Sequence, residues 1–285
     1  MDLSIIILSF NTKNLLDDCL DSVFQQTKGI KFEVLVVDNH STDGSGEMVK
    51  KKFPQVKLIS NQKNLGFAQA NNQGMKKAQG KYLLLLNSDT KVKGSALKKL
   101  VSLAEEKRNL GIAGPKLLNL DETPQPSTGP FYTLPVTCFS LFRGDRYLRH
   151  AYSQEKAVDW LYGACFLIKR ELIDKIGFLD EKFFMYVEEM EFCFRAKKAG
   201  FQVYYFPQAE VYHLERGSSP EGKQKAIWGI YQGLIYFYQK HFAPWQLAVL
   251  KLLLRVKAIL VWVIGWLTNN QELKETYAKA FKLVG

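Results

Sequence analysis

A chain of 285 residues is long enough for one large α/β domain with an appendage, or for two small domains. Its four cysteines lie far apart without a CxxC pair, which excludes a zinc ribbon and a disulfide framework and predicts buried, reduced thiols. The 39 lysines and arginines exceed the 28 aspartates and glutamates, and the resulting net charge of +11 indicates an anionic partner, either nucleic acid or a membrane surface.

Strand patterns and helix patterns alternate along the first third of the chain. The strand patterns are apolar, several of them β-branched, and they cover residues 3–9, 32–37, 56–60 and 82–86. Helix patterns lie between them, at residues 15–23, 44–52 and 64–77. This spacing predicts βαβ units, a mainly parallel sheet and an α/β fold.

Polar residues follow the strand pattern at 82–86, which stops at Asn87, Ser88 and Asp89. Ligands of open α/β sheets bind at the carboxyl ends of the strands, so this triplet lies where chemistry is expected. An ionised aspartate offers only acceptor oxygens, the ligands that Mg²⁺ or Mn²⁺ prefers. A polar turn before the next helix, at 94–106, is the alternative, and the triplet alone leaves both open.

Asp38 follows the strand pattern at 32–37 in the same way, where it can accept hydrogen bonds from a base N–H or a ribose hydroxyl. A helix N-cap is the alternative, although Asp43 is better placed for it. A dinucleotide-binding domain would carry G-x-G-x-x-G after its first strand. The corresponding residues here, 9–14, contain no glycine, which argues against an NAD- or FAD-dependent enzyme.

Four segments, in this order, resemble the motifs of the family 2 inverting glycosyltransferases of GT-A fold, and most closely those of the bacterial rhamnosyltransferases. The segments are Ser9-Phe10-Asn11, Val36–Gly44, Asn64–Gly74 and Leu84–Asp89. The resemblance covers about residues 3 to 216. It implies the fold of the nucleotide-diphospho-sugar transferases, a nucleotide-sugar donor, a divalent cation (Mg²⁺ or Mn²⁺) and inversion at the sugar C1.

The same resemblance implies roles for single residues. Asp38 would hold the base or ribose, and Asn64 and Gly66 would border the nucleotide. Asp89 would end the D-x-D-type metal motif, in which Asn87 replaces the first carboxylate and leaves one acid for the metal. The nucleotide-sugar-binding set also includes the other polar residues of these motifs, Ser9, Asn11, Asn71 and Ser88.

Residues 119–156 contain four prolines and are expected to form a long excursion over the active-site face. Residues 158–168 return to a strand pattern, and in the resembling family this stretch flanks the donor and acceptor sugars. Trp160 would then stack on a sugar ring, or alternatively pack in the core. Gly163 leaves room for the close approach of a ligand or of another backbone.

Glu188, Glu189 and Glu191 follow an aromatic run and open a helix pattern. The helix dipole alone accounts for one or two acids in a first turn. An inverting transfer, however, needs a base for the acceptor hydroxyl, and a carboxylate among apolar groups has a raised pKa. By resemblance the second acid, Glu189, is the base, with Glu188 and Glu191 as alternatives. Two strand patterns follow, at 203–207 and 211–214. His213, in the second of them, matches the family's metal-binding histidine and would join Asp89, although a lone histidine is more often structural.

The C-terminal part begins at residue 219, and its residues 223–285 carry nine basic and only two acidic residues, and thus +7 of the net charge. Its helix patterns, at 227–240 and 245–267, mix these charges with tryptophan and aliphatic residues. This composition favours helices in the interface of an anionic membrane over nucleic-acid binding. Lys251, Arg255 and Lys257 interrupt the apolar run and argue against a membrane span. Packing on the catalytic domain or in a homodimer is the alternative.

The expected organisation is therefore a catalytic domain at 1–218 and a membrane-associating region at 219–285. We expect an inverting, metal-dependent glycosyltransferase at the cytoplasmic face of the membrane, acting on a lipid-linked or growing glycan acceptor. By resemblance, the best expectation for the donor is dTDP-rhamnose. A sugar-nucleotide pyrophosphorylase is one alternative, but it would carry a glycine-rich, basic phosphate loop near its N-terminus. A catalytically silent membrane-interaction protein is the other.

Overall fold

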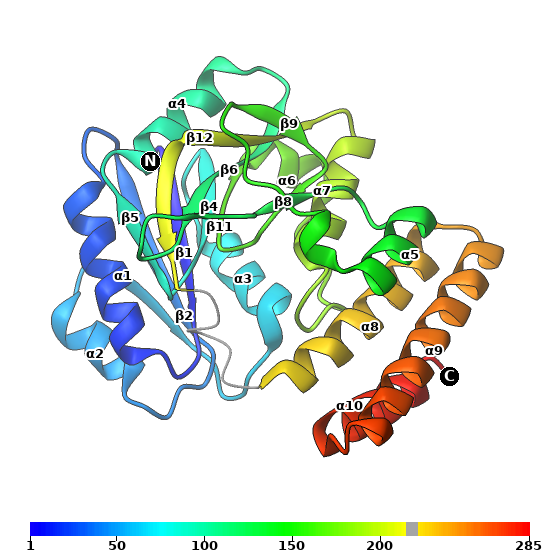
Figure 1. Ribbon diagram of the computed structural model, residues 1–285. Coiled ribbons are helices and arrows are strands. Elements are labelled where there is room, and N and C mark those ends of the chain that lie inside the picture. Colours follow the sequence, from blue (N-terminus) through cyan, green and yellow to red (C-terminus); the bar gives the residue numbers. More distant parts are fainter. Residues whose placement is uncertain (215–221) are drawn as a thin grey trace.

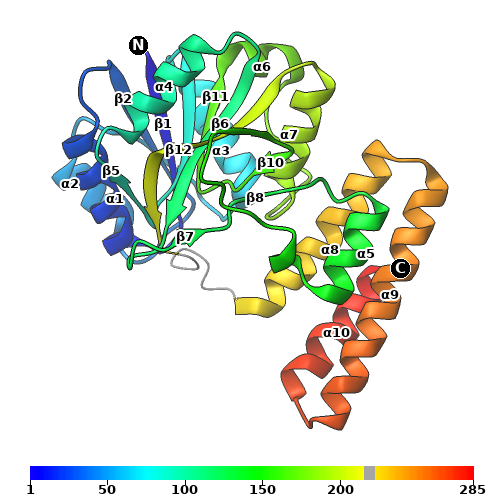
Figure 2. The ribbon, with the colours of Figure 1, turned by 45° about the horizontal axis from the view of Figure 1, so that its top comes forward.

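The computed structural model describes residues 1–214 and 222–285, and its centre is a large mixed sheet with helices on both faces (Figure 1). The strands lie in the order β3-β2-β1-β4-β11-β6-β12-β5, with β7 and β9 added at β6 and β12. Three further helices at the C-terminus stand to one side of this sheet, next to α5 (Figure 2). The predicted α/β fold, with a mostly parallel sheet and a helical C-terminal extension, is confirmed.

The N-terminal strands are parallel and end together. They are β1 (Leu3–Ser9), β2 (Phe32–Asp38), β3 (Lys57–Ser60) and β4 (Tyr82–Asn87). The helices that connect them are α1 (Lys13–Gln26), α2 (Ser45–Lys52) and α3 (Gly66–Lys77). In this register Ser9 pairs with Asp38, and Leu8 pairs with Asn87. The polar residues that follow these strands therefore share one edge of the sheet.

The second half of the sheet is mixed. Its strands are β5 (Thr90–Lys93), β6 (Leu110–Leu118), β7 (Pro124–Gln125), β9 (Lys156–Val158), β11 (Cys165–Lys169) and β12 (Gln202–His213). A separate two-stranded sheet pairs β8 (Thr128–Gly129) with β10 (Trp160–Leu161). The helices of this half are α4 (Ala96–Glu106), α5 (Leu134–Arg143), the short 3₁₀ helix η1 (Asp145–Tyr147), α6 (Arg170–Ile176) and α7 (Glu188–Lys198). β11 lies antiparallel between β4 and β6, and β12 is parallel to β6 but antiparallel to β5.

Three expectations about elements need correction. Residues 158–168 do not form one strand, because the chain turns at 162–164 and splits the stretch among β9, β10 and β11. The excursion at 119–156 is not a bare loop, because it contains α5, two short strands and part of a third. The two strands expected at 203–207 and 211–214 are one strand, β12, whose register with β6 shifts between Phe206 and Glu210.

Both faces of the sheet are buried, which explains why its central strands are apolar without interruption. Along β1, Ile5 and Ile7 face the core under α1, α2 and α4. Ile6 points to the other side, into the core under α3, α6 and α7. On α1 the four residues Leu16, Cys19, Leu20 and Val23 recur at helical spacing and are all fully buried.

The C-terminal helices are α8 (Gly222–His241), α9 (Pro244–Leu267) and α10 (Gln271–Leu283). The core under α3 and α7 continues into them through Leu234 and Phe237 of α8 and Leu250 of α9. One side of α9 stays exposed and apolar. Among the described residues, no helix is both long and apolar enough to span a bilayer.

One expectation about the thiols is wrong. Cys19, Cys165 and Cys193 are buried, but Cys138 is exposed. It lies on α5, a surface helix that buries only Thr137.

Candidate active site

The first part of the site, here called the donor rim, comprises the polar residues at the carboxyl ends of β1, β2 and β4 and at the start of α3. Ser9, at the end of β1, lies 3.0 Å from the hydroxyl of Thr12, which donates a 2.9 Å hydrogen bond to Ser88 after β4. All three are buried. Hydroxyls from two strand ends thus form one fixed chain, which includes the predicted binding residues Ser9 and Ser88 and also Thr12, which was not predicted.

The loops after β1 and β2 are tied together as well. Asp38 is buried, and its Oδ1 accepts a 3.0 Å hydrogen bond from the Ser41 N–H. Asn11 takes a left-handed backbone conformation (φ 53°), donates its N–H to the Ser41 hydroxyl and accepts from the Thr42 N–H at 2.7 Å. The structure therefore places Asn11 and Asp38 on adjoining loops at the same edge of the sheet.

Asn64 begins the turn into α3. Its Oδ1 accepts from the Asn39 side chain at 2.8 Å and from the Gly66 N–H at 2.9 Å. Gly66 has φ 78°, and a Cβ there would collide with the Phe184 carbonyl, so only glycine fits. Asn71 is buried and donates its amide to the Phe67 carbonyl within α3.

Asp89 and His213 form the second part of the candidate site and are here called the metal pair, after the role that the family resemblance implies for them. They come together because His213 ends β12 opposite Thr90, the first residue of β5. His213 Nε2 lies 3.6 Å from Asp89 Oδ1. Gln125 holds the other side of the ring: its Oε1 is 2.9 Å from His213 Nδ1, and its Nε2 donates to the His213 carbonyl. This support fixes the orientation of the ring and turns Nε2 towards Asp89.

The metal pair fits a hard divalent cation. Two ligands bound to one such ion at about 2.1 Å lie roughly 3–4 Å apart, and the 3.6 Å separation falls in that range. Within the described part of the chain, no group of three or more His, Cys, Asp or Glu side chains could hold a metal. Mg²⁺ is commonly bound by one or two protein groups together with phosphate oxygens of the substrate. Asn87, where the family motif has a carboxylate, ends β4 and donates its N–H to the Ala164 carbonyl.

The third part is the acid cluster, Glu188, Glu189 and Glu191 in the first turn of α7. Glu188 is buried and Glu189 half-buried, and one carboxylate oxygen of each, Oε2, is inaccessible and has no hydrogen-bond partner among the described residues. Burial raises the pKa of Glu188, and the neighbouring charge of Glu189 raises it further. Burial also raises the pKa of Glu189, against the opposing effects of the Arg149 charge and of backbone N–H groups.

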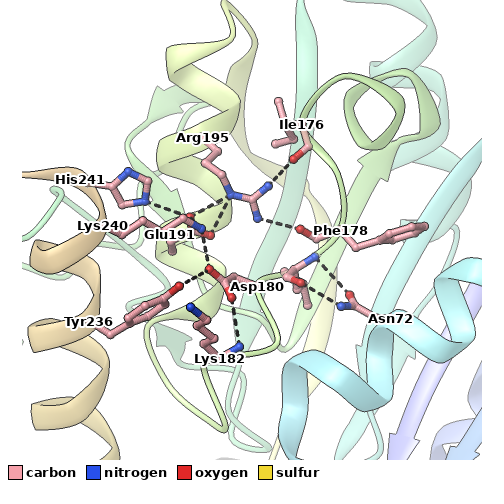
Figure 3. A network of polar contacts seen from close by, with 11 residues as sticks. Asn72, Ile176, Phe178, Asp180, Lys182, Glu191, Arg195, Tyr236, Lys240 and His241 are labelled. Carbon is pink, nitrogen blue, oxygen red and sulfur yellow. Dashed lines mark hydrogen bonds and ion pairs between the residues drawn. The ribbon is translucent and has the colours of Figure 1, made fainter.

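Glu191 lies in a different environment (Figure 3). It is fully buried, and Arg195, Lys240 and His241 all lie 2.9 Å from its carboxylate. Burial alone would raise its pKa, but the His241 hydrogen bond and the Arg195 and Lys240 charges bring that pKa below the usual value. Glu191 is therefore an ionised centre of a polar network, unlike its two neighbours.

The stretch before β11 borders the acid cluster. A Cβ on Gly163 would lie 3.8 Å from Glu189 Cβ and 3.4 Å from the Phe67 ring. Trp160 is 4 % exposed and donates its indole N–H to the Pro130 carbonyl, so it packs as a core residue. The Arg149 guanidinium lies over the Tyr162 ring, 4.8 Å from its centroid, and pairs with Asp145. A cation thus lies close to the acids.

Three supporting residues escaped sequence reasoning. Gln125 orients His213 from 88 positions away in the chain. Asn72 bonds to the backbone of Leu179, 107 positions away. Thr12 bridges Ser9 and Ser88. Thr12 and Asn72 gave a local signal, since Thr12 directly follows the first polar motif and Asn72 lies within the third, whereas Gln125 gave none.

Comparison with known proteins adds to this geometry. Residues 4–177 match the family model described as "Glycosyl transferase family 2". An N-acetylglucosaminyl-diphospho-decaprenol L-rhamnosyltransferase of Mycobacterium tuberculosis is 26 % identical over 243 residues, which cover 78 % of this chain and 79 % of the relative.

Two solved structures are similar in fold. GalNAc-T7, solved with UDP, GalNAc and Mn²⁺, matches with a TM-score of 0.64 and 18 % identity, over 84 % of this chain and 48 % of that one. The mannosyltransferase PcManGT of Pyrobaculum calidifontis, solved with GDP-Man and Mn²⁺, matches with a TM-score of 0.58 and 16 % identity, over 99 % of this chain and 84 % of that one.

Proposed function

The chain belongs to glycosyl transferase family 2 and is a nucleotide-sugar glycosyltransferase, and from this premise we propose an inverting transfer with Glu189 as the base. The acceptor hydroxyl oxygen attacks C1 of the donor sugar and forms the new glycosidic bond. Its proton passes to the Glu189 carboxylate. The bond from C1 to the diphosphate oxygen breaks, and its electron pair leaves with the nucleoside diphosphate. A single displacement of this kind inverts the configuration at C1.

One observation carries this proposal: the Glu189 carboxylate lies beside Gly163 with a buried, unpartnered oxygen among the described residues and a raised pKa. Such a carboxyl group suits proton transfer near neutral pH. The charge of Glu191 is already neutralised by three cationic or imidazole partners, so it supports the site instead. Glu188 is more deeply buried and shares the cluster's charge with Glu189, which makes it the reserve.

We propose that Asp89 and His213 hold the divalent cation, Mg²⁺ or Mn²⁺, next to the donor diphosphate. Such an ion supplies positive charge to the departing phosphate oxygens. Gln125 keeps His213 Nε2 directed at Asp89, while Asp38 and the hydroxyl chain of the donor rim face the nucleoside side. The arrangement thus separates donor binding, at the strand ends, from proton transfer, at α7.

The proposed donor sugar is rhamnose, carried by dTDP, and the proposed acceptor is a lipid-linked or growing cell-surface glycan. The support is the resemblance of the motifs to rhamnosyltransferases together with the name of the mycobacterial relative. GDP-mannose and UDP-linked sugars are the donors to compare, since the similar folds were solved with GDP-Man and with UDP.

We further propose that residues 1–218 carry the chemistry and that residues 219–285 hold the protein at the cytoplasmic face of the membrane as a peripheral protein. The support is the exposed side of α9, where Trp245, Leu252, Trp266 and Leu267 are 60 % exposed or more. Basic residues occupy the same helix, which suits an anionic lipid surface. A lipid-linked acceptor would be met at such a surface.

The proposal is tested by thermal shift and transfer assays with dTDP-rhamnose, UDP-GlcNAc and GDP-mannose, each with Mn²⁺ or with EDTA. A ligand that binds only the folded state at 100 times its Kd stabilises it by about 2.7 kcal/mol. We expect dTDP-rhamnose with Mn²⁺ to raise the Tm most and to pass its sugar to a GlcNAc-diphospho-lipid. Formation of dTTP from pyrophosphate would indicate a pyrophosphorylase instead. Absence of both binding and transfer would refute the enzyme assignment.

A further inference from the structure

Within the described part of the chain, the two acids that matter most have no side-chain hydrogen-bond partner, and only backbone N–H groups, including that of Gly163, bond to their carboxylates. Glu188 and Glu189 each bury an oxygen that has no hydrogen-bond partner among the described residues. Their positions must therefore come from the backbone of α7 and from the segment that leads into it. That segment, residues 178–187, is here called the acid loop.

The acid loop is held on one side by α3. The Phe67 N–H donates to the Phe184 carbonyl at 2.7 Å, and the absent side chain of Gly66 lets that carbonyl approach. Asn72 pairs with Leu179 through both of its amide atoms, at 2.8 and 3.1 Å. This contact connects the loop to the donor rim.

The last two residues of the acid loop have an unusual backbone. Tyr186 and Val187 have φ angles of 72° and 75°, the left-handed region that favours glycine. A β-branched residue is especially unfavourable there, and such conformations persist only where the surroundings enforce them. Val187 is also the N-cap of α7, directly before Glu188, and no side chain caps the helix there. The direction in which Glu188 and Glu189 leave the backbone depends on this pair.

The surroundings that enforce this conformation belong to α8. A Cβ on Gly229 would lie 2.8 Å from Tyr186 Cδ2, and a Cβ on Gly233 would lie 2.8 Å from Val187 Cγ2 and 3.1 Å from the Tyr186 carbonyl. The two distances of 2.8 Å are shorter than any ordinary Cβ contact. Two glycines one helical turn apart thus let the α8 backbone pack directly against Tyr186 and Val187, here called the left-handed pair.

Polar contacts reinforce this packing (Figure 3). The Asp180 carboxylate accepts from Tyr236 at 2.9 Å and from Lys240 at 2.6 Å. Lys240 also bonds to Glu191, which lies one turn or less from the two acids on α7. Arg195 in turn donates to the carbonyls at the end of α6 and the start of the acid loop. α8 thereby contacts both the loop and the helix that carries the acids.

We propose that α8 is a positioning element for the base, with Gly229 and Gly233 setting the left-handed pair and Lys240 joining the acid loop to α7. This inference rests on the proposed role of Glu189. Catalytic geometry is sensitive to shifts of about 0.5 Å. A small displacement of α8 is therefore sufficient to move Glu189 away from the acceptor hydroxyl. The C-terminal region consequently takes part in catalysis and does not serve only as an anchor.

The test is Gly233→Ala, with Gly265→Ala as the matched control. Gly265 is also a helical glycine of the C-terminal region with a close contact, 3.1 Å to Leu273 Cβ, but it packs against α10 away from the site. We expect Gly233→Ala to lower kcat about ten- to hundredfold, because a misplacement of about 1 Å has effects of that order. Binding of dTDP with Mn²⁺ should not change. Gly265→Ala should keep kcat.

Two further measurements sharpen the test. Adding Val187→Gly to Gly233→Ala removes the clashing side chain and suits the positive φ, so kcat should recover in part. Hydrogen exchange of the amides at 184–191 should be faster in Gly233→Ala and in Lys240→Met than in the wild type or in Gly265→Ala. This readout needs no activity, and Lys240→Met introduces no new atoms into the contact with the loop.

Equal kcat and equal exchange for Gly233→Ala and Gly265→Ala would overturn the positioning role, even while the wild-type protein transfers sugar. Joint loss of dTDP binding and kcat in Lys240→Met would also overturn it, since α8 would then support the whole fold. If the wild type transfers no sugar from any donor, the proposed function fails instead. The exchange data would still show whether α8 holds the loop.

Discussion

In the donor rim, the polar side chains bond to one another: Ser9 to Thr12, Thr12 to Ser88, and Asn39 to Asn64. In the acid cluster, Glu188 and Glu189 lie side by side, and each has a buried oxygen with no partner within the described residues. Paired polar groups are already arranged for a ligand, whereas unpaired buried carboxylates lower the stability of the fold. The difference fits the proposed roles, in which the donor rim binds the nucleotide and the acid cluster supplies the base.

The largest effect should come from removing the base. Glu189→Gln keeps the shape of the side chain but cannot take a proton, so kcat should fall by about 10² or more while dTDP binding persists. The wild-type rate should rise with pH through a pKa above the usual value of about 4.3 for glutamate, because burial raises the pKa of Glu189. This rise should be absent in the variant. Glu171→Gln, on the surface of α6, is the control, and normal turnover of Glu189→Gln would transfer the role to Glu188.

The metal pair should respond in the opposite way. Asp89→Ala and His213→Ala should weaken Mn²⁺-dependent binding of dTDP, and Gln125→Leu, which releases the ring of His213, should weaken it about 10- to 100-fold. Isothermal titration with and without EDTA measures this, with the exposed Asp174→Asn as a control. If all three variants bind dTDP and Mn²⁺ as the wild type does, the metal pair is misassigned. Donor binding and proton transfer would then not be separated between the strand ends and α7.

A smaller effect concerns stability. The pKa of Glu188 is raised in the folded protein, so the native state holds its proton more tightly than the unfolded state does. Stability therefore falls as the pH rises from the unfolded pKa, about 4.3, through the raised folded pKa. Glu188→Gln should raise the Tm at pH 8, by about 2 °C for each kcal/mol gained, and have little effect near pH 4. A lower Tm at pH 8 would mean that the carboxylate is stabilised by a partner.

The smallest effect tests α9, which belongs to neither region. Trp266→Ser and Leu267→Ser should each lower binding to phosphatidylserine vesicles about five- to tenfold, because apolar area buried in lipid is lost. Binding should also weaken with added salt. Leu120→Ser, another exposed leucine but in a loop of the catalytic part, is the control. If the full-length protein does not bind vesicles and sediments as a dimer, the apolar side of α9 is a subunit contact instead.

The parallel part of the fold was predictable because its signals are local. Strands buried on both faces are continuous apolar runs, and their polar ends align automatically when the strands are parallel. The positions of Asp38 and Asp89 follow from that rule alone. The approach of His213 to Asp89 was implied by the family resemblance, and the pairing of β12 with β5 supplies its physical reason.

The acid loop was not predictable in the same way. Glycines within a helix pattern lower its helical propensity, and nothing in the sequence shows that Gly233 faces Val187. The environments of Glu189 and Glu191 also differ only through remote residues, since Lys240 and His241 lie about 50 positions beyond Glu191. The family resemblance singled out Glu189 and kept Glu188 and Glu191 as alternatives, but nothing in the sequence showed that their environments differ. The position of α8 distinguishes them.

The contact between Val187 and Gly233 also implies an order of events while the ribosome makes the chain. Domains form from the N-terminus at about 5–20 residues per second, so α8 emerges several seconds after the acid loop. The strands of the donor rim, β1, β2 and β4, are complete by residue 87. We therefore expect a nascent chain, or one released before α8, to hold its nucleotide site nearly finished while the left-handed pair is still free to relax. Such fragments should therefore bind the nucleotide but transfer little sugar.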